Sequence, residues 1–393
     1  MVTAAGAAIG GNALLSAAGA GRDRYLARLA ALVGVDSGTA DVPGVNRAAR
    51  LVAGYARESG LEAEERPLAD GRTAVVARRR GTGRARIVLA GHLDTVFPAG
   101  TAAERPFRVD GALGRAHGPG VCDDKGGLLA GIAAVETLIA LGAERYGEIV
   151  LVCSPDEETG SPLGRAVLEA EARGAAAALC LEGARENGDL VSARSGVTDL
   201  EITLRGRAAH AGIEPGRGAN AALAAARLTV ACQALNGSRP GAGVNVGVLA
   251  AGSAPNVVAA SGRLVVDVRA DRAAAFDAMI ADIRRLAAEH GVPGVAAEVT
   301  EHAPMPPWER GEATARLVGQ AVLAGGTVGV PVRDAATGGG ADANLIAALG
   351  VPVLDGLGPV GGCDHAPGEW LDLASVVPRT ALLAALIDRV AGA

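Results

Sequence analysis

Residues 149–160 read Ile-Val-Leu-Val-Cys-Ser-Pro-Asp-Glu-Glu-Thr-Gly, an apolar run followed by three acids, Asp156, Glu157 and Glu158. The apolar run predicts a buried strand, so the two neighbouring glutamates stand just beyond its end. Like charges side by side raise each other's pKa unless a cation neutralises them, which suggests a metal for one glutamate and proton chemistry for the other. On spacing alone, a solvated loop glutamate beside a helix N-terminal one is the simpler explanation.

A histidine and an aspartate follow a second strand-like run. Residues 87–90 read Ile-Val-Leu-Ala, and residues 91–95 read Gly-His-Leu-Asp-Thr. Alternation along an extended chain puts His92 and Asp94 on one side, where the carboxylate can accept a hydrogen bond from one ring nitrogen and leave the other for a metal. A structural histidine would fit as well, although open α/β sheets collect their active residues at the carboxyl ends of strands.

A glycine-rich loop presents two further acids. Residues 118–127 read Gly-Pro-Gly-Val-Cys-Asp-Asp-Lys-Gly-Gly and precede a helical pattern over residues 128–141. Such a loop could be no more than a turn that caps a helix. However, the chain has 37 lysines and arginines, and its single lysine, Lys125, lies directly after these acids.

Two more candidates complete the set. Glu182 ends the apolar run of residues 175–181, and His365 lies in the glycine-rich residues 361–367. Each is ordinary when taken alone. Imidazoles together with several carboxylates, and without paired cysteines, form the ligand mixture that suits zinc, cobalt or manganese.

Together these motifs resemble one enzyme family. They are His-x-Asp-Thr-Val at 92–96, Gly-Pro-Gly with Asp-Asp-Lys-Gly-Gly at 118–127, Asp-Glu-Glu at 156–158, Glu182 and the late His365. In this order, over residues 24–391, they are similar to the co-catalytic zinc aminoacyl-hydrolases, which include glutamate carboxypeptidase, acetylornithine deacetylase, succinyl-diaminopimelate desuccinylase and aminoacylase. Asp-Thr-Val-Phe at 94–97 and Gly-Pro-Gly are closest to the glutamate carboxypeptidase branch.

The resemblance implies two Zn²⁺ ions per chain, for which Co²⁺ or Mn²⁺ can substitute. His92, Asp123 and Glu182 would hold one ion. Asp123, Glu158 and His365 would hold the other, so that Asp123 bridges both. Such a metal pair shares a hydroxide and polarises the scissile carbonyl, which makes a serine or cysteine nucleophile unnecessary.

The resemblance also implies roles for residues beside the metals. Glu157 would be the general base, and Asp94 would support His92 from behind. The Asp123–Asp124 peptide bond is expected to be cis. The chain contains no Gly-x-Ser-x-Gly motif, which disfavours an acyl-enzyme mechanism.

The order of elements predicts an α/β fold with an inserted domain. Helical and strand-like patterns alternate as an α/β sandwich, with helices at 23–33, 44–60, 126–141 and 163–173 and strands at 61–66, 73–79, 86–91, 148–154 and 177–182. A β-α-β-β-α-β order of ferredoxin-like type follows, with strands at 197–205, 244–250, 262–270 and 295–301 and helices at 218–235 and 272–290.

Four segments are expected from this pattern. Residues 1–22 would form a loose N-terminal extension. Residues 23–194 and 306–393 would form the catalytic domain, and residues 195–305 the inserted domain. By resemblance, the inserted domain would be a lid and a dimerisation module, which predicts a homodimer.

The inserted domain and the segment after it bring their own candidates. By resemblance, His210 would stabilise the tetrahedral oxyanion, often in the partner subunit's site, and Asn256 and Arg269 would contact substrate. Gly339 and Gly340 could form a backbone nest for a carboxylate. On residue type alone, a turn histidine is favoured for His210, an arginine on a strand is usually a surface residue, and a plain glycine turn is as acceptable as a nest.

Composition limits the other classes of function. A net charge of −6 and 2% aromatic residues exclude a nucleic-acid-binding surface. No window approaches the ~20 apolar residues that a membrane span needs. Five cysteines without close pairs suit a reducing compartment, and residues 1–20 lack the basic start of a signal peptide, so we expect a cytoplasmic protein.

The sequence therefore predicts a zinc-dependent hydrolase that cleaves the amide bond of an N-acyl amino acid or small peptide with a free carboxylate. A carboxypeptidase or dipeptidase and a deacylase for acetyl, succinyl or larger groups would share every catalytic residue. An inactive metal-binding protein is a third hypothesis, against which an intact Glu157 and a complete ligand set argue. Any acidic substrate side chain would have Arg185 and Arg194 as its nearest arginine partners after Glu182.

Overall fold

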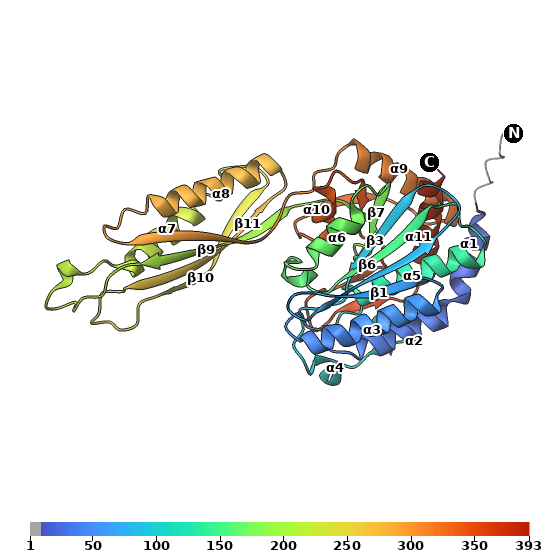
Figure 1. Ribbon diagram of the computed structural model, residues 1–393, viewed down its shortest axis with the longest axis horizontal. Helices are drawn as coiled ribbons and strands as arrows, with labels where there is room; N and C mark the ends of the chain where they lie inside the picture. Colours follow the sequence, from blue (N-terminus) through green and yellow to red (C-terminus); the bar gives the residue numbers. More distant parts are fainter. Residues whose placement is uncertain (1–8, 393) are drawn as a thin grey trace. The chain divides into compact units, whose positions relative to one another are not determined.

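The computed structural model describes residues 9–392 and divides them into two compact units (Figure 1). The first unit contains the chain as far as Ser192, together with Arg310–Ala336 and the chain from Ala341 onward. The second contains Ala193–Glu309 and Thr337–Gly340. The sequence did not predict that the chain returns to the second unit at Thr337–Gly340.

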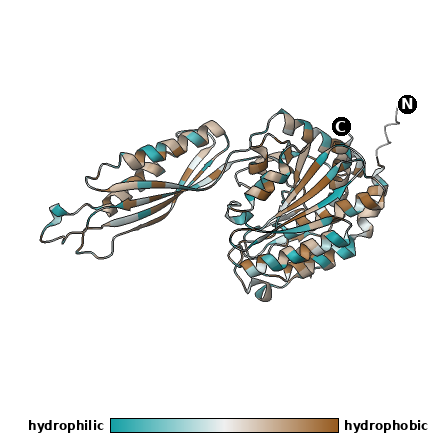
Figure 2. Ribbon diagram, viewed as in Figure 1, coloured by the Kyte–Doolittle hydropathy of each residue, from teal (hydrophilic) through white to brown (hydrophobic). Residues whose placement is uncertain are grey.

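A six-stranded sheet forms the centre of the first unit. Its order is β1-β2-β6-β3-β7-β14, with β1 (Glu62–Pro67), β2 (Thr73–Arg80), β3 (Arg86–His92), β6 (Glu148–Ser154), β7 (Ala177–Cys180) and β14 (Val353–Leu354). The strands β6, β3, β7 and β14 are mutually parallel, whereas β1 and β2 are antiparallel to their neighbours. Residues 149–153 are buried along their whole length, which is typical of parallel strands covered on both faces. Figure 2 shows the central strands of this sheet as largely hydrophobic.

Helices cover both faces of this sheet (Figure 1). One side carries α6 (Arg165–Ala172) and α10 (Asp342–Ala347), which contact each other; the other carries most of the remaining helices. The other helices of the unit are α1 (Gly11–Ala20), α2 (Arg22–Val33), α3 (Val42–Glu58), α4 (Thr101–Glu104), α5 (Lys125–Ala140), α9 (Glu312–Val328) and α11 (Val376–Ala391). The predicted α/β sandwich is confirmed.

The N-terminal segment corrects one expectation. Residues 1–22 were expected to be loose, yet α1 is a helix that packs against α5 and α11, with Leu14 and Ala18 buried in the core. Gly11 lies so close to the backbone of Thr327 that a side chain there would clash. An alanine- and glycine-rich segment has no strong apolar pattern, but its small residues allow close packing of helices. Residues 1–8 lie outside the described part of the chain.

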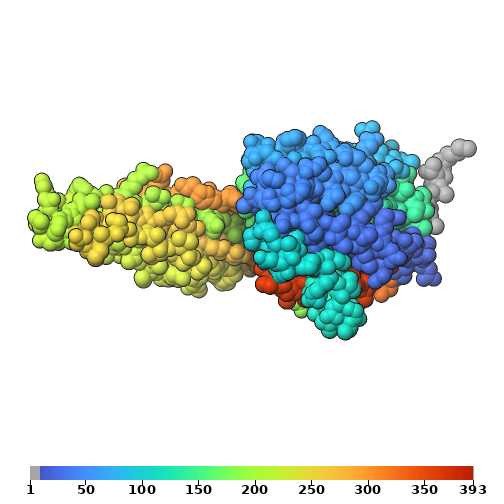
Figure 3. All heavy atoms as spheres, turned by 90° about the horizontal axis from the view of Figure 1, so that it is seen from below, coloured from blue at the N-terminus to red at the C-terminus, as the bar shows by residue number. Residues whose placement is uncertain are grey.

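A small antiparallel sheet brings two distant segments together. Its order is β15-β16-β5-β4, with β4 (Arg108–Asp110), β5 (Arg115–His117), β15 (Gly361–Gly362) and β16 (Trp370–Asp372). Trp370 pairs with His117, so the segment that carries His365 lies beside the start of the glycine-rich loop. Figure 3 shows these early (teal) and late (red) parts of the chain in contact on one face. The short strands β8 (Leu190–Arg194) and β13 (Asp334–Thr337) form a further two-stranded sheet.

The second unit has the predicted β-α-β-β-α-β order. Its elements are β9 (Gly196–Arg205), α7 (Ala221–Gln233), β10 (Ala242–Ala251), β11 (Ser261–Ala270), α8 (Ala273–Ala288) and β12 (Ala296–Met305). The sheet is antiparallel in the order β10-β11-β9-β12, with β10 at one edge. Both helices contact β9 and β11 and each other, and they bury one face of the sheet.

Candidate metal centre

The sheet explains why the acidic and histidine motifs converge. His92 is the last residue of β3, the Glu157–Thr159 turn of 3-10 helix follows β6, and Glu182 follows β7. These three strands are parallel neighbours, so their carboxyl ends meet at one edge of the sheet. Asp123 comes from the loop before α5, and His365 from the loop between β15 and β16.

Asp123 lies between the two histidines. His92 Nε2 is 2.8 Å from its Oδ1, and His365 Nε2 is 3.0 Å from its Oδ2. His365 Nε2 is also 3.0 Å from Glu158 Oε2, and His92 Nε2 is 3.6 Å from Glu182 Oε1. Within residues 9–392, two groups therefore offer ligand atoms within 4.8 Å of one another: His92, Asp123 and Glu182, and Asp123, Glu158 and His365. Asp123 belongs to both groups, with one oxygen towards each.

Shared protons hold this cluster together. Hydrogen bonds to Asp123 and Glu158 raise the pKa of His365 to about 11. Burial would raise the pKa of Asp123, but its bonds to His365 and His92 lower it below the usual aspartate range. Burial raises the pKa of Glu158. Imidazoles and carboxylates at these distances are a donor set that fits a divalent cation, which would replace the shared protons.

Asp94 holds the neighbouring residues in place. His92 Nδ1 donates to the backbone oxygen of Asp94 at 3.0 Å and lies 3.4 Å from its carboxylate, which leaves Nε2 facing Asp123. The buried carboxylate also accepts the backbone N–H groups of Glu157 (3.1 Å) and Glu158 (3.2 Å) and the hydroxyl of Thr39. Asp94 therefore orients the paired glutamates as well as the histidine, a link that the sequence did not predict.

Glu157 is a buried carboxyl beside the cluster. Burial raises its pKa well above the usual glutamate value; His92 opposes this shift, and Glu182, Asp342 and Glu158 add to it. Asp342 is itself buried and accepts hydrogen bonds from Ser154 and Ser161, both at 2.5 Å. A carboxyl with a raised pKa can exchange a proton near neutral pH.

Two buried charges next to the cluster are structural. Lys125 Nζ donates to the backbone oxygens of Val35 (2.9 Å) and Pro119 (3.2 Å), so this lysine supports the glycine-rich loop. Glu369 accepts three backbone N–H groups of the same loop. Sequence reasoning missed Glu369, because nothing in Pro-Gly-Glu at 367–369 distinguishes a buried acceptor from a turn residue. The Asp123–Asp124 peptide bond is cis, as the family resemblance implied.

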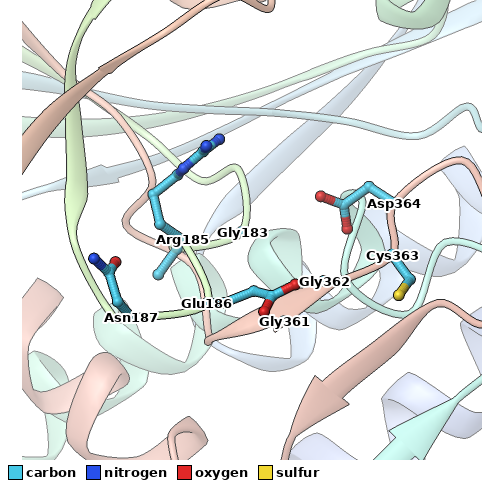
Figure 4. A pocket seen from close by; sticks show the side chains of 9 residues that line it. Gly183, Arg185, Glu186, Asn187, Gly361, Gly362, Cys363 and Asp364 are labelled. Carbon is cyan, nitrogen blue, oxygen red and sulfur yellow. The ribbon is translucent and has the colours of Figure 1, made fainter.

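A hollow of about 420 Å³ adjoins the ligand residues along the chain (Figure 4). Its walls are residues 183–187, which follow Glu182, and residues 361–364, which precede His365. Arg185, Glu186 and Asp364 place charged groups around it (Figure 4). The hollow is therefore polar, and the residues that line it adjoin Glu182 and His365 in the sequence.

The second unit carries its candidates in two separate places. His210 Nδ1 accepts the N–H groups of Gly212 (3.1 Å) and Ile213 (3.2 Å), and the N–H of Ala211 donates to the backbone oxygen of Asn256. His210 and Asn256 thus lie together, near the end of β9 at Arg205.

Arg269 lies at the opposite end of the sheet. Its register partner is Val197, at the start of β9. Its guanidinium bonds to Asp267 and, at 3.1 Å, to the backbone oxygen of Gly338, while Gly339 accepts a hydrogen bond from Arg194. Gly340 packs against Met305 and Val197. The structure therefore groups Arg269 with the glycine segment, and it separates both from His210 and Asn256.

The fold and the ligand groups define a metal-dependent hydrolase, and the sequence profile of peptidase family M20/M25/M40 matches residues 88–389. The chain belongs to this family of peptidases and deacylases, as the motifs predicted. None of the helices in residues 9–392 is long and apolar enough to cross a membrane.

Among its relatives, carboxypeptidase G2 of Pseudomonas sp. (strain RS-16) is 31% identical over 385 residues, which cover 96% of this chain and 91% of the relative. Succinyl-diaminopimelate desuccinylase of Xanthomonas campestris is 29% identical over 327 residues, 79% of this chain and 85% of the relative. The crystal structure of a tripeptidase from Staphylococcus aureus aligns with a TM-score of 0.79 at 22% identity, over 94% of this chain and 98% of that one, which supports the fold.

Proposed function

We propose that the protein is a two-metal amide hydrolase that releases an amino acid with a free carboxylate from an N-acyl amino acid or small peptide. The observation that carries the proposal is the position of Asp123, which directs one oxygen to each of two ligand groups. His92, Asp123 and Glu182 would hold one Zn²⁺, and Asp123, Glu158 and His365 the other. Two such ions would supply Lewis acidity and a bound hydroxide, and Co²⁺ or Mn²⁺ would serve as well.

Glu157 would move the proton in this reaction. It takes a proton from the attacking water and delivers it to the leaving nitrogen, which is the step that amide hydrolysis needs. Its burial, its raised pKa and the hold of Asp94 on its backbone support this role. Cations in the two ligand groups would favour its ionised form, since they oppose the carboxylates that surround it.

His210 would donate a hydrogen bond to the oxyanion of the tetrahedral intermediate. Because its Nδ1 accepts backbone N–H groups, the neutral ring carries its proton on Nε2, where it can donate. Residues 197–205 of β9 span about 25 Å at roughly 3.3 Å per residue. A small substrate cannot touch both ends of such a strand, so His210 and Arg269 of one chain would serve different active sites.

This separation suggests a homodimer that forms through the second unit, which would also act as a lid. The backbone of β10 is open along one edge, and Val248 and Leu249 on it are exposed. Leu223 and Val230 on α7 are exposed too. An open edge strand beside apolar side chains favours pairing with a second copy. Val248→Lys should shift the protein towards monomer in sedimentation experiments; an unchanged dimer would rule out this edge.

Arg269, Gly339 and Gly340 would bind the substrate of one active site, and Asn256, which lies beside His210, would bind the substrate of the other. A guanidinium suits a carboxylate because it can make two parallel hydrogen bonds, and the glycine backbone beside it can add more. The hollow next to Glu182 and His365 would take the other part of the substrate. We further propose a cytoplasmic location, because five cysteines without close pairs in the sequence suit a reducing compartment.

A carboxypeptidase is the first candidate, since carboxypeptidase G2 is 31% identical over nearly the whole chain. A deacylase is the second, supported by the desuccinylase relatives. The deciding experiment is a hydrolysis screen of N-acetyl, N-succinyl and N-aroyl amino acids and dipeptides. Release of free amino acid from at least one class, lost on treatment with a chelator, is the expected result. Activity that survives complete metal removal would contradict the proposal, and a fully metal-loaded protein without activity would favour the inactive metal-binding alternative.

A further inference from the structure

Glu369 is a buried carboxylate at a place where burial is costly. It is 2% exposed and precedes β16 directly, four residues after His365. Burial raises its pKa to about 7, while hydrogen bonds from three backbone N–H groups lower the cost of its charge. An acid that the fold keeps in such surroundings has a role that a neutral side chain would not fill.

The partners of Glu369 are the backbone of the loop that presents Asp123. Its Oε2 accepts the N–H of Gly120 at 2.9 Å. Its Oε1 accepts the N–H groups of Cys122 (2.8 Å) and Asp123 (3.1 Å). One carboxylate therefore fixes three of four successive amides, and the last of them belongs to the residue that lies between the two ligand groups.

The same glutamate is tied to the segment of the other ligand. Its own backbone N–H donates to Ala366, next to His365, and its backbone oxygen contacts His117 Nδ1 at 3.0 Å. Asp123 and His365 come from distant parts of the chain, yet Glu369 connects the backbone of one loop to that of the other. A shift of either loop would move a carboxylate oxygen or an imidazole nitrogen away from the second ligand group.

A carboxylate suits this task and an amide does not. Both oxygens of Glu369 accept, one from a single N–H and the other from two. A glutamine has only one oxygen, and its NH₂ group would face the N–H of Gly120 or those of Cys122 and Asp123, so at least one donor would lose its partner.

We propose that Glu369 is a positioning residue that fixes the Asp123 loop against the His365 loop, so that both ligand groups are preformed for metal. This inference rests on the proposed metal site. Residues that orient ligands in this way typically change metal affinity or activity by about 10- to 100-fold when they are replaced.

The test compares Glu369→Gln with Glu171→Gln. Glu171 is a matched control because it is also buried in the first unit, but its partners are Arg66, Arg78 and Arg86, away from the ligand residues. We would measure zinc affinity by titration, the unfolding temperature of the metal-free proteins, and the visible absorption of the cobalt-loaded proteins.

Glu369→Gln should weaken binding of at least one metal by about 10-fold or more and alter the cobalt spectrum. It should also lower kcat by a larger factor than it changes KM, and excess metal should restore part of the activity. Glu171→Gln should lower the unfolding temperature and leave metal affinity and the spectrum unchanged. Wild-type affinity and spectrum in Glu369→Gln would overturn the inference. If Glu369→Gln does not fold, Glu369→Asp, which keeps the charge but is shorter, should show the same weaker binding, and wild-type binding there would again overturn it. A wild-type protein that binds no metal pair would instead refute the proposed function itself.

Discussion

The two units differ in how their functional candidates are arranged. In the first unit, five ligand candidates from five separate segments form two groups whose ligand atoms lie within 4.8 Å of one another, and the buried groups Asp94 and Glu369 hold the backbones of Glu158 and Asp123. In the second unit, the candidates are exposed and occupy opposite ends of one sheet. Under the proposed function, the groups for the reaction chemistry would lie within one unit, whereas the groups that would recognise substrate and oxyanion would depend on assembly of two chains.

Glu157→Ala tests whether the first unit supplies the groups for the reaction. Loss of the general base should lower kcat by at least about 10³-fold, within the range that such catalysis supplies, while both metals remain bound. The measurement is turnover together with metal content. A variant with a near-normal rate would show that Glu157 is not the base.

His210→Ala tests whether the second unit supplies the oxyanion donor. This variant should lower kcat by about 10²-fold or more without loss of metal. His302→Ala is the control, since His302 is also exposed on the second unit but lies on β12. Mixing His210→Ala with Glu157→Ala should restore part of the activity, because a mixed dimer contains one complete site. Failure to recover activity in proven mixed dimers would contradict a role across subunits.

Arg269→Ala should raise KM by about 10- to 100-fold, because a charge-assisted hydrogen bond to the substrate carboxylate contributes about 1.5–3 kcal/mol. Arg269→Lys should recover little, since an ammonium cannot make the paired bonds. Arg263→Ala on the same strand, where Arg263 pairs with Glu201, should leave KM unchanged. Equal effects at both positions would mean that Arg269 acts on the fold and not on substrate.

A further expected effect is a pH dependence of metal affinity, which concerns metal binding and not turnover. The pKa of His365 in the metal-free protein is about 11, above the unfolded value, so the ring binds a proton at neutral pH that a metal must displace. Zinc affinity should therefore rise between about pH 6 and about pH 9, with net proton release that calorimetry in two buffers can count. Affinity that stays constant over this range would contradict the shared-proton cluster.

These regions also differ in how far the sequence predicts them. His92, Glu158 and Glu182 could be found because each follows a strand-like run, and parallel neighbours bring such positions to one edge. Asp123 and His365 could be found only because the glycine-rich stretches that carry them resemble motifs of the family. The β-α-β-β-α-β order followed from periodicity in the same way. Glu369, Asp342 and the bonds from Asp94 to the glutamate turn could not be found, because their partners are backbone groups and hydroxyls from distant segments. The packing of α1 was missed for a related reason, since small residues carry little pattern until a neighbouring helix is in place.

Under the proposed function, Asp123 would lie between two metals in the first unit. Anomalous diffraction from crystals of the zinc-loaded protein tests it most directly. We expect two peaks roughly 3.5 to 4 Å apart, one beside His92 and Glu182 and the other beside Glu158 and His365, with Asp123 between them. A single peak, or a pair that Asp123 does not touch, would contradict the account.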